Sequence, residues 1–296
     1  MPSNTRAPLK FVHCDVFTET PYSGNSLAVF PESHELDDRE MLSITQELRH
    51  FESIFLKQTE DRYVYRARVF DLFEELPFAG HPIIGAACTL HRQSFTADDV
   101  TWTFKLNDDR KVQVQTKLRE GVYSAVLDQG RPAFLDRVPD AARSQFAQAF
   151  NLLEADLANL PLEVISTGLK YLVVPVRRNL GNAKIVVPDL DEKLRAHGAE
   201  FAYLFNPETF EGRHWNNDGV VEDVATGSAA GVVGAYALKH DIAKDGEALL
   251  LRQGHYMARP SKIEVTAFGD PEDVNSVHVG GPVAFVGTGQ LEVLPC

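Results

Sequence analysis

The chain has 296 residues, of which 44% are hydrophobic and 24% charged, and its formal net charge is −13. This composition is that of a folded globular protein long enough for two domains, and it excludes an intrinsically disordered chain. The negative charge disfavours nucleic acid and anionic membrane surfaces as partners, although a local pocket can still bind a small anion.

The cysteines and the N-terminal residues predict the cellular compartment. The first ten residues lack the hydrophobic core of a secretory signal, and no apolar run is long enough for a transmembrane helix. Cys14, Cys88 and Cys296 are widely spaced and odd in number, which favours a reducing compartment over a disulfide framework. We therefore expect a cytoplasmic protein.

The first half of the chain alternates strand and helix patterns. Apolar spacing predicts amphipathic or buried helices at 37–51 and 82–92. Runs rich in valine, phenylalanine and tyrosine predict strands at 9–18, 24–30, 52–58, 62–71, 99–106, 111–118 and 121–128. The polar stretch 128–140 is the best candidate boundary, so we expect one domain over 1–128 and a second over 129–296, with a last strand that can cross between them.

The second half runs in a similar order. Helices are predicted at 142–153 and 225–240, and 182–198 reads as a strand that leads into a helix. Further strands are predicted at 162–168, 170–176, 200–206, 261–268, 276–281 and 283–294.

Two segments share a layout of small residues at the start of a helix. "EELPFAGHPIIGAA" (74–87) and "EDVATGSAAGVVGAY" (222–236) align when Gly80 is placed on Gly227, an offset of 147 residues, close to half the chain. The alignment sets His81 on Ser228 and preserves the order of the predicted elements. We interpret it as two similar domains, each a sheet around a central helix; the alternative is a coincidence between two ordinary loop–helix junctions.

These two helix starts are suited to binding an anion. The first turn of a helix has N–H groups without intrahelical partners and carries partial positive charge, and small residues let a ligand approach. His81 fits the N-cap position with Pro82 as the first helical residue, and Ser228 can cap the second helix. If the halves face each other, both positive ends would hold one carboxylate and stabilise a carbanion-like charge without a metal.

Acidic residues near these starts are candidate proton carriers. Asp223 precedes the second start, and Glu74 and Glu75 precede the first. Glu52 lies among apolar neighbours, whose desolvation would raise its pKa as a general acid/base requires. Each acid taken singly also fits a solvated surface group, and His81 also fits a structural cap, so spacing alone predicts only an anion-binding cleft.

Other chemistries lack their motifs. The sequence has no closely spaced histidine or cysteine pair for zinc, no phosphate-binding P-loop and no G-x-S-x-G hydrolase motif. "VGTGQ" near the C-terminus lies inside a strand pattern and indicates a turn rather than a dinucleotide site. We therefore expect neither a metal nor a cofactor.

Five stretches together resemble the phenazine-biosynthesis isomerase family (PhzF-like), within the diaminopimelate-epimerase fold. They occur in order along nearly the whole chain as "DVFTETPYSGNSLAVF", "FESIFL", "ELPFAGHPIIGAA", "GVVEDVATGSAAG" and "LRQGHYMARPSKIEV". The resemblance implies an α+β protein of two pseudo-symmetric domains, each a barrel-like, mostly antiparallel sheet around a central helix. It also implies a cofactor-free, homodimeric isomerase with its site between the domains.

The resemblance also assigns roles to residues. It implies Glu52 as the glutamate that moves the proton, and His81 and Asp223 as its catalytic partners. It implies Gly80, Gly227 and Ser228 as the residues that hold a small, carboxylate-bearing substrate, with trans-2,3-dihydro-3-hydroxyanthranilate as the substrate of the type reaction.

Two departures bear on the substrate. The family often has serine before the glutamate where this chain has Phe51, which removes a hydroxyl and puts the type substrate in doubt. Racemases of this fold use a cysteine at each helix start, but here neither start has one, and Cys88 is expected in the core. The alternatives to an isomerase are a binding protein with the same cleft and an epimerase that works without thiols.

Overall fold

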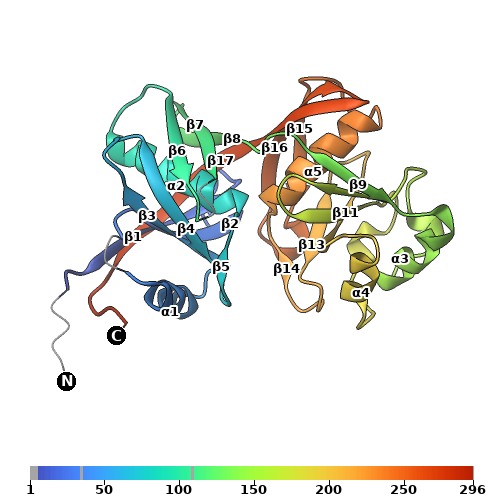
Figure 1. Ribbon diagram of the computed structural model, residues 1–296, viewed down its shortest axis with the longest axis horizontal. Helices are drawn as coiled ribbons and strands as arrows, with labels where there is room; N and C mark the ends of the chain where they lie inside the picture. Colours follow the sequence, from blue (N-terminus) through green and yellow to red (C-terminus); the bar gives the residue numbers. More distant parts are fainter. Residues whose placement is uncertain (1–5, 34–35, 108–109, 296) are drawn as a thin grey trace. The chain divides into compact units, whose positions relative to one another are not determined.

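The computed structural model describes residues 6–33, 36–107 and 110–295. Its contacts divide the chain into two units, of which unit 1 comprises Met1–Leu127 with Gly280–Cys296, and unit 2 comprises Asp128–Val279 (Figure 1). The C-terminal residues therefore belong with unit 1 and not with the second half of the chain. The reason is that the last strand begins in unit 2 and ends in unit 1. The sequence analysis allowed for such a strand between the two halves.

Unit 1 is built on a closed barrel of eight strands. In barrel order these are β1 (Leu9–Val16), β2 (Asn25–Phe30), β3 (Glu52–Gln58), β4 (Val64–Phe70), β6 (Val100–Lys105), β7 (Lys111–Arg119), β8 (Val122–Asp128) and β17 (Asp273–Leu291). β17 returns to pair with β1 and closes the ring. The pairs β2–β3 and β4–β6 are parallel, and the other ladders described by register are antiparallel.

Helix α2 (Gly80–Ser94) packs inside this barrel. All its residues from Gly80 to His91 are buried, so the helix has no polar face. Gly85 allows the close packing, because a Cβ there would lie 2.4 Å from Leu27 Cδ2 on β2. A helix enclosed by strands on several sides needs small residues at such points.

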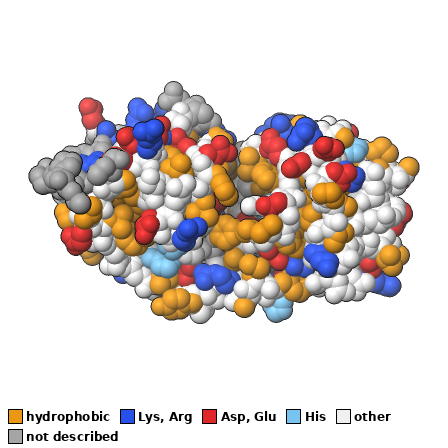
Figure 2. Space-filling view, turned by 90° about the horizontal axis from the view of Figure 1, so that it is seen from below, with side chains coloured by type: hydrophobic (Ala, Val, Ile, Leu, Met, Phe, Trp, Pro, Cys, Tyr) orange, Lys and Arg blue, Asp and Glu red, His pale blue; other side chains and the backbone are white. Residues whose placement is uncertain are grey.

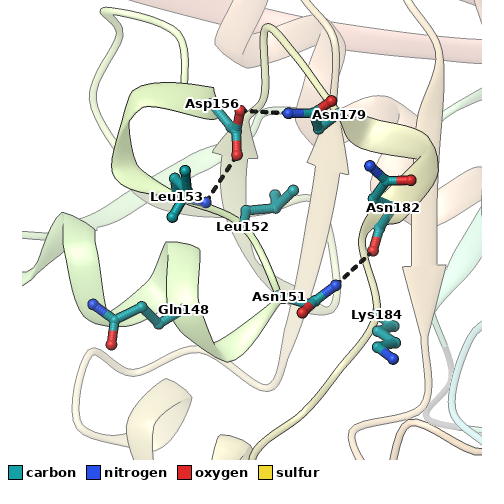
Figure 3. Close-up of a pocket in the computed structure, with 8 residues that line it drawn as sticks. All are labelled: Gln148, Asn151, Leu152, Leu153, Asp156, Asn179, Asn182 and Lys184. Carbon is teal, nitrogen blue, oxygen red and sulfur yellow. Dashed lines mark hydrogen bonds between the residues drawn. The ribbon is translucent and has the colours of Figure 1, made fainter.

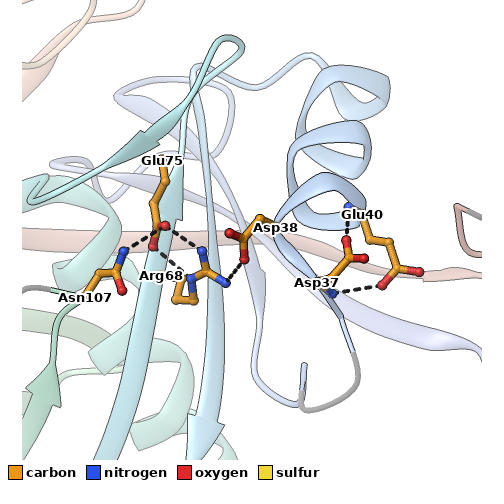
Figure 4. Close-up of polar contacts among 6 residues, drawn as sticks. All are labelled: Asp37, Asp38, Glu40, Arg68, Glu75 and Asn107. Atoms are coloured by element: carbon orange, nitrogen blue, oxygen red, sulfur yellow. Dashed lines mark hydrogen bonds and ion pairs between the residues drawn. The ribbon is translucent and has the colours of Figure 1, made fainter.

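Helix α1 (Asp38–Leu48) packs on the outer surface of the same barrel. It covers an apolar cluster that includes Phe30 and Phe55, whose rings stack with centroids 4.6 Å apart. A capping box begins the helix, since the Asp37 side chain accepts from the Glu40 N–H and the Glu40 side chain accepts from the Asp37 N–H (Figure 4). These two bonds pair the N–H groups of Asp37 and Glu40 with side chains of the helix start itself.

Unit 2 repeats this arrangement around helix α5 (Gly227–Lys239). Its six-stranded sheet has the order β14 (Glu222–Asp223), β13 (Gly212–Trp215), β12 (Phe201–Phe205), β11 (Lys170–Pro175), β10 (Glu163–Ser166) and β9 (Ala133–Arg137). The antiparallel pair β15 (Ala248–Gln253) and β16 (Ser261–Asp270) lies in the same unit, and β16 packs on α5 together with β10 and β11. The remaining helical segments are η1 (Asp140–Ala142), α3 (Arg143–Ala149), η2 (Glu154–Asp156), η3 (Leu180–Asn182), α4 (Leu190–Arg195) and η4 (His255–Met257).

The strand pairings show that the two units share one topology. In unit 1, β1 and β2 are antiparallel, β2 and β3 parallel, β3 and β4 antiparallel, and a short hairpin from β4 to β5 (Glu75–Leu76) leads into α2. In unit 2, β10 to β14 follow the same sequence of pairings and lead into α5. The predicted α+β fold with two pseudo-symmetric halves, each a barrel-like sheet around a helix, is confirmed.

Individual elements differ from the sequence prediction. The strand expected over 182–188 is absent from the described structure; that stretch runs extended past the end of α3, where the Lys184 and Val186 N–H groups bond the carbonyls of Phe150 and Ala149. β9 lies in the stretch 128–140, which was the candidate domain boundary. The two strands predicted over 276–281 and 283–294 form one strand, β17.

Candidate active site

The first helix start follows the β4–β5 hairpin, and α2 begins two residues earlier than the sequence indicated. Ala79 is the N-cap, with extended backbone, and Gly80 is the first helical residue. The prediction of His81 as the N-cap is therefore wrong: His81 is the second helical residue, and its side chain is buried. Because glycine and alanine precede it, no side chain caps this helix, and the imidazole is left for another role.

Glu52 lies beside His81. It is the first residue of β3 and pairs in parallel register with Leu27, whose side chain faces α2, so Glu52 is directed to the same side. Its Oε2 is 3.3 Å from His81 Nε2, and the two side chains are 18% and 5% exposed, respectively. A carboxylate and an imidazole at this distance, largely shielded from water, can exchange or share a proton.

The second helix start has the same geometry in unit 2. Thr226 is the N-cap of α5, its carbonyl accepts from the Ala230 N–H, and Gly227 is the first helical residue. Ser228 is therefore not the cap that the sequence indicated but the second helical residue, the position that His81 holds in α2. Its hydroxyl lies 2.8 Å from Tyr171 Oη, and both side chains are buried.

Asp223 and Gly227 are held by neighbouring polar groups. The Asp223 carboxylate accepts from Thr226 Oγ1 at 2.5 Å and from the Ala225 N–H at 3.3 Å. The Gly227 carbonyl accepts from Gln129 Nε2 at 3.0 Å. Asp223 is thus fixed just ahead of the first turn of α5.

Neither central helix has a side-chain cap. The Ala79 side chain is a methyl group, which cannot accept a hydrogen bond, and the Thr226 side chain bonds Asp223 instead of the first-turn N–H groups. The surface helix α1, in contrast, has a complete capping box. N–H groups at a buried helix start without a cap are suited to a bound anion, as the sequence analysis expected.

An arginine–glutamate pair braces the hairpin before each helix start, and the sequence analysis missed both. Arg68 on β4 binds Glu75 through Nε at 2.8 Å and Nη2 at 2.5 Å (Figure 4). Arg213 on β13 binds Glu222 through the same two nitrogens at 2.8 and 2.7 Å. Glu75 and Glu222 are related by the offset of 147 residues, so the alignment contained the signal, but the arginines differ in offset by two residues.

The predicted site residues divide equally between the units. Glu52, Gly80 and His81 lie together in unit 1, and Asp223, Gly227 and Ser228 lie together in unit 2. Glu75, one of the sequence's candidate proton carriers, is instead engaged with Arg68, and Glu74 is exposed. That the two groups form a single site stays a prediction.

Other parts of the surface carry less chemistry. A hollow in unit 2 is lined by Gln148, Asn151, Leu152, Leu153, Asp156, Asn179, Asn182 and Lys184. Its polar groups form hydrogen bonds with one another (Figure 3). The Asn179 side chain and the Leu153 N–H both donate to the Asp156 carboxylate, and the Asn151 side chain donates to the Asn182 carbonyl. On the face drawn in Figure 2, acidic and basic side chains are interspersed. Nothing on that face favours a polyanionic partner.

The described residues hold neither a candidate metal-binding cluster nor a candidate membrane-spanning helix. Within residues 6–33, 36–107 and 110–295, no group of three or more histidine, cysteine or acidic side chains could hold a metal ion. Among the same residues, no helix combines the length and apolarity that crossing a bilayer requires. Cys14 and Cys88 are buried, as expected for Cys88, and burial raises the pKa of both thiols; Cys296 lies outside the described residues.

Comparisons with known proteins place the chain. Residues 14–289 match the family model described as phenazine biosynthesis-like protein. An uncharacterised isomerase of Pasteurella multocida is 30% identical, covering 97% of this chain and 95% of its own. The trans-2,3-dihydro-3-hydroxyanthranilate isomerase of Pseudomonas aeruginosa is 28% identical, covering 95% and 98%.

A solved structure extends the likeness to the fold. A "predicted epimerase" from Pseudomonas aeruginosa superposes with a TM-score of 0.90 at 44% identity, covering 96% of this chain and 99% of that one. The diaminopimelate-epimerase-like fold implied by the sequence motifs is thereby confirmed, and an isomerase or epimerase class is supported. Because the family model spans nearly the whole chain, this protein belongs to the phenazine biosynthesis-like protein family.

Proposed function

We propose that the protein is a cofactor-independent isomerase that moves a proton within a small, carboxylate-bearing substrate, of the cyclic amino-acid kind. The observation that supports this most is the Glu52–His81 pair at the uncapped start of a buried helix. The names of relatives support the reaction class, since several are isomerases and one acts on trans-2,3-dihydro-3-hydroxyanthranilate.

In the proposed reaction Glu52 takes a proton from one carbon of the substrate and returns it to another. His81, whose Nε2 lies 3.3 Å from Glu52 Oε2, orients the Glu52 carboxylate and donates a hydrogen bond to the substrate. The charge that develops on the substrate is stabilised by the N–H groups of the first turn of α2 and by Gly80. Asp223 orients or protonates the substrate from the other half of the site, where Gly227 and Ser228 hold its polar groups.

The substitution Glu52→Gln tests the assignment with little change in shape. We expect Glu52→Gln to abolish turnover of trans-2,3-dihydro-3-hydroxyanthranilate while binding stays within a few-fold, because the amide cannot accept the proton. Glu47→Gln is the matched control, since Glu47 is exposed on α1. Normal turnover by the Glu52 variant would rule out its role. If the unchanged protein binds the compound without converting it or exchanging its protons, a binding protein is the better description.

An epimerase is the second candidate, favoured by the 44% identity to a protein described as a predicted epimerase. It would use Glu52 with a partner other than a thiol, because neither helix start carries a cysteine and Cys14 and Cys88 are buried. Chiral chromatography of products separates the two reactions: an isomerase changes the connectivity of its substrate, whereas an epimerase changes only the configuration.

We also propose that the enzyme is a cytoplasmic homodimer. The family resemblance supports the dimer, and the cysteine pattern supports the compartment. Sedimentation velocity at micromolar concentration tests the first point, and a single species of monomer mass would contradict it. Cell fractionation tests the second.

A further inference from the structure

The buried side chain of Gln253 is the centre of a hydrogen-bond network around the second helix start. Gln253 is the last residue of β15 and is 1% exposed. Its Oε1 accepts from Tyr203 Oη at 2.9 Å and from the Thr226 N–H at 3.0 Å. Its Nε2 donates to the Asp223 carbonyl at 2.9 Å and to Thr226 Oγ1 at 3.0 Å. All four bonding positions of the amide are thus filled.

The neighbours of this amide allow only one orientation. A backbone N–H can only donate and a backbone carbonyl can only accept. The Thr226 N–H therefore requires the oxygen of Gln253 on its side, and the Asp223 carbonyl requires the NH2 group on the other. The NH2 group then necessarily donates to the Thr226 hydroxyl.

This orientation fixes the direction of the next hydrogen bond. A threonine hydroxyl has a single hydrogen, and here its oxygen already accepts from Gln253. The hydrogen points to the Asp223 carboxylate, with Thr226 Oγ1 2.5 Å from Oδ2. The chain of bonds thus runs from Tyr203 through Gln253 and Thr226 and ends on a carboxylate.

The backbone is shaped to bring Gln253 this close. The next residue, Gly254, has φ of +78°, and a Cβ there would lie 2.3 Å from the Arg259 carbonyl and 2.7 Å from the Val224 carbonyl. Only glycine fits this combination of conformation and approach. The segment that carries Asp223 therefore packs directly against the end of β15.

We propose that Thr226 and Gln253 are positioning residues that hold the Asp223 carboxylate in its acceptor state and aim it at the start of α5. Their importance for turnover rests on the proposed function, in which Asp223 orients or protonates the substrate. Neither residue touches the reacting atoms. Thr226 gives up its capping bond for this purpose, which also leaves the first-turn N–H groups of α5 uncapped.

Other titratable groups also lie around Asp223. His214 on β13 pairs with it across the hairpin, and burial holds the pKa of this histidine below its usual value. Tyr203 on β12 is buried, which raises its pKa well above the ordinary value. Glu222, the preceding residue, is paired with Arg213. The hydrogen bonds described for the Thr226 side chain go to Asp223 and Gln253 and not to these three groups, so a change at Thr226 removes no direct partner of theirs.

The first experiment measures the carboxylate directly and requires no substrate. Carbon-13 NMR of protein with labelled aspartate side chains gives the Asp223 signal as the one that Asp223→Asn removes. At pH 7 we expect Thr226→Val to shift this carboxyl signal, because a charge-assisted donor to the carboxylate is lost. Thr226→Ser, which keeps the hydroxyl, restores the original chemical shift. An unchanged chemical shift in Thr226→Val overturns the proposal.

A change at Gln253 tests the direction of the network. Gln253→Glu replaces the NH2 donor with an acceptor, so the Thr226 hydrogen turns to the new carboxylate. We expect the Asp223 carboxyl signal to shift in this variant as in Thr226→Val, although the Gln253 amide bonds the Asp223 backbone carbonyl and not its carboxylate. If Gln253→Glu leaves the chemical shift unchanged, Gln253 does not orient the threonine and that part of the proposal fails.

The second experiment links the network to turnover of trans-2,3-dihydro-3-hydroxyanthranilate. We expect Thr226→Val to lower kcat roughly tenfold with KM little changed, and Thr226→Ser to restore it. If Asp223→Asn is inactive but Thr226→Val has normal kcat, the positioning role is wrong. If Asp223→Asn is fully active, the role of Asp223 in the proposed function fails, while the NMR chemical shift still decides whether the network exists.

Discussion

The two arginine–glutamate pairs offer one chemical change at equivalent places in the two units. Glu222→Gln and Glu75→Gln each remove a negative charge from a side-on pair with arginine and preserve the size of the side chain. The surroundings of the pairs differ. Arg213 and Glu222 are 8% and 10% exposed, whereas Arg68 and Glu75 are 25% and 17% exposed.

The surroundings determine the expected loss of stability. Arg213 donates from Nη1 to the carbonyls of Leu180, Gly181 and Ala183, and these uncharged groups cannot replace the lost carboxylate. Breaking a buried pair by removing one partner costs about 3–5 kcal/mol. Arg68 retains a second carboxylate, Asp38, 2.7 Å from Nη1, and is closer to water. Loss of such a pair costs about 1 kcal/mol or less.

Thermal unfolding followed by circular dichroism measures the difference. At 2–4 °C for each kcal/mol in units of this size, we expect Glu222→Gln to lower Tm by roughly 6–20 °C and Glu75→Gln by roughly 4 °C or less. The less buried pair is the matched control for the more buried one. Equal losses, or a larger loss for Glu75→Gln, would refute the argument that burial and the lack of a second carboxylate make the unit 2 pair more important.

Two further changes test the packing and the electrostatics. Gly85→Ala would place a Cβ 2.4 Å from Leu27 Cδ2 and 3.0 Å from Val16 Cγ2, so we expect it to lower the unfolding free energy by about 1–3 kcal/mol. The control is Gly287→Ala, where a Cβ meets nothing within 4 Å. Equal unfolding midpoints for the two variants would contradict the close packing of α2. Burial lowers the pKa of His214 from its unfolded value of 6.5, so the unfolded chain binds the proton first and stability falls as the pH drops below about 6.5 toward the folded pKa. We expect His214→Gln to reduce this pH dependence by up to about 1.4 kcal/mol for each pH unit, measured by urea unfolding between pH 7 and pH 5; an unchanged slope would show that His214 is not the group responsible.

The repeated topology could be predicted from the sequence because its strongest signal is local. Two helix starts that share glycine and alanine, at Gly80 and Gly227, produced the offset of 147 residues. That alignment preserved the order of the predicted elements, whereas the pairing of the strands came from the structure. The helix boundaries were less accurate, since a glycine that opens a helix has no side chain to indicate whether it is the cap or the first helical residue.

The errors have physical causes in tertiary structure. β9 is paired in register only with β10 and has exposed residues on both faces, so its sequence does not alternate and resembles a linker. The apolar stretch 183–187 alternates like a strand, but its N–H groups bond the end of α3 instead of a neighbouring strand. Pairing partners of this kind are not encoded in local periodicity.

The site was predicted in part for a related reason. Glu52 and His81 are 29 positions apart in the sequence, and only the family motifs joined them; the structure then placed their side chains 3.3 Å apart. The network from Gln253 to Asp223 could not be foreseen, because it depends on the end of β15 packing against the start of α5. Such contacts depend on the fold as a whole.

The central claim is that Glu52 moves a proton within a bound substrate. Its most direct test is turnover of trans-2,3-dihydro-3-hydroxyanthranilate in heavy water, with the position of deuterium read by NMR. We predict deuterium at the carbon that receives the proton, because the protonated Glu52 carboxyl exchanges its proton with solvent while the intermediate is bound, and no incorporation with Glu52→Gln. Incorporation at the same rate in that variant, or no conversion of the compound by the unchanged protein, would contradict the account.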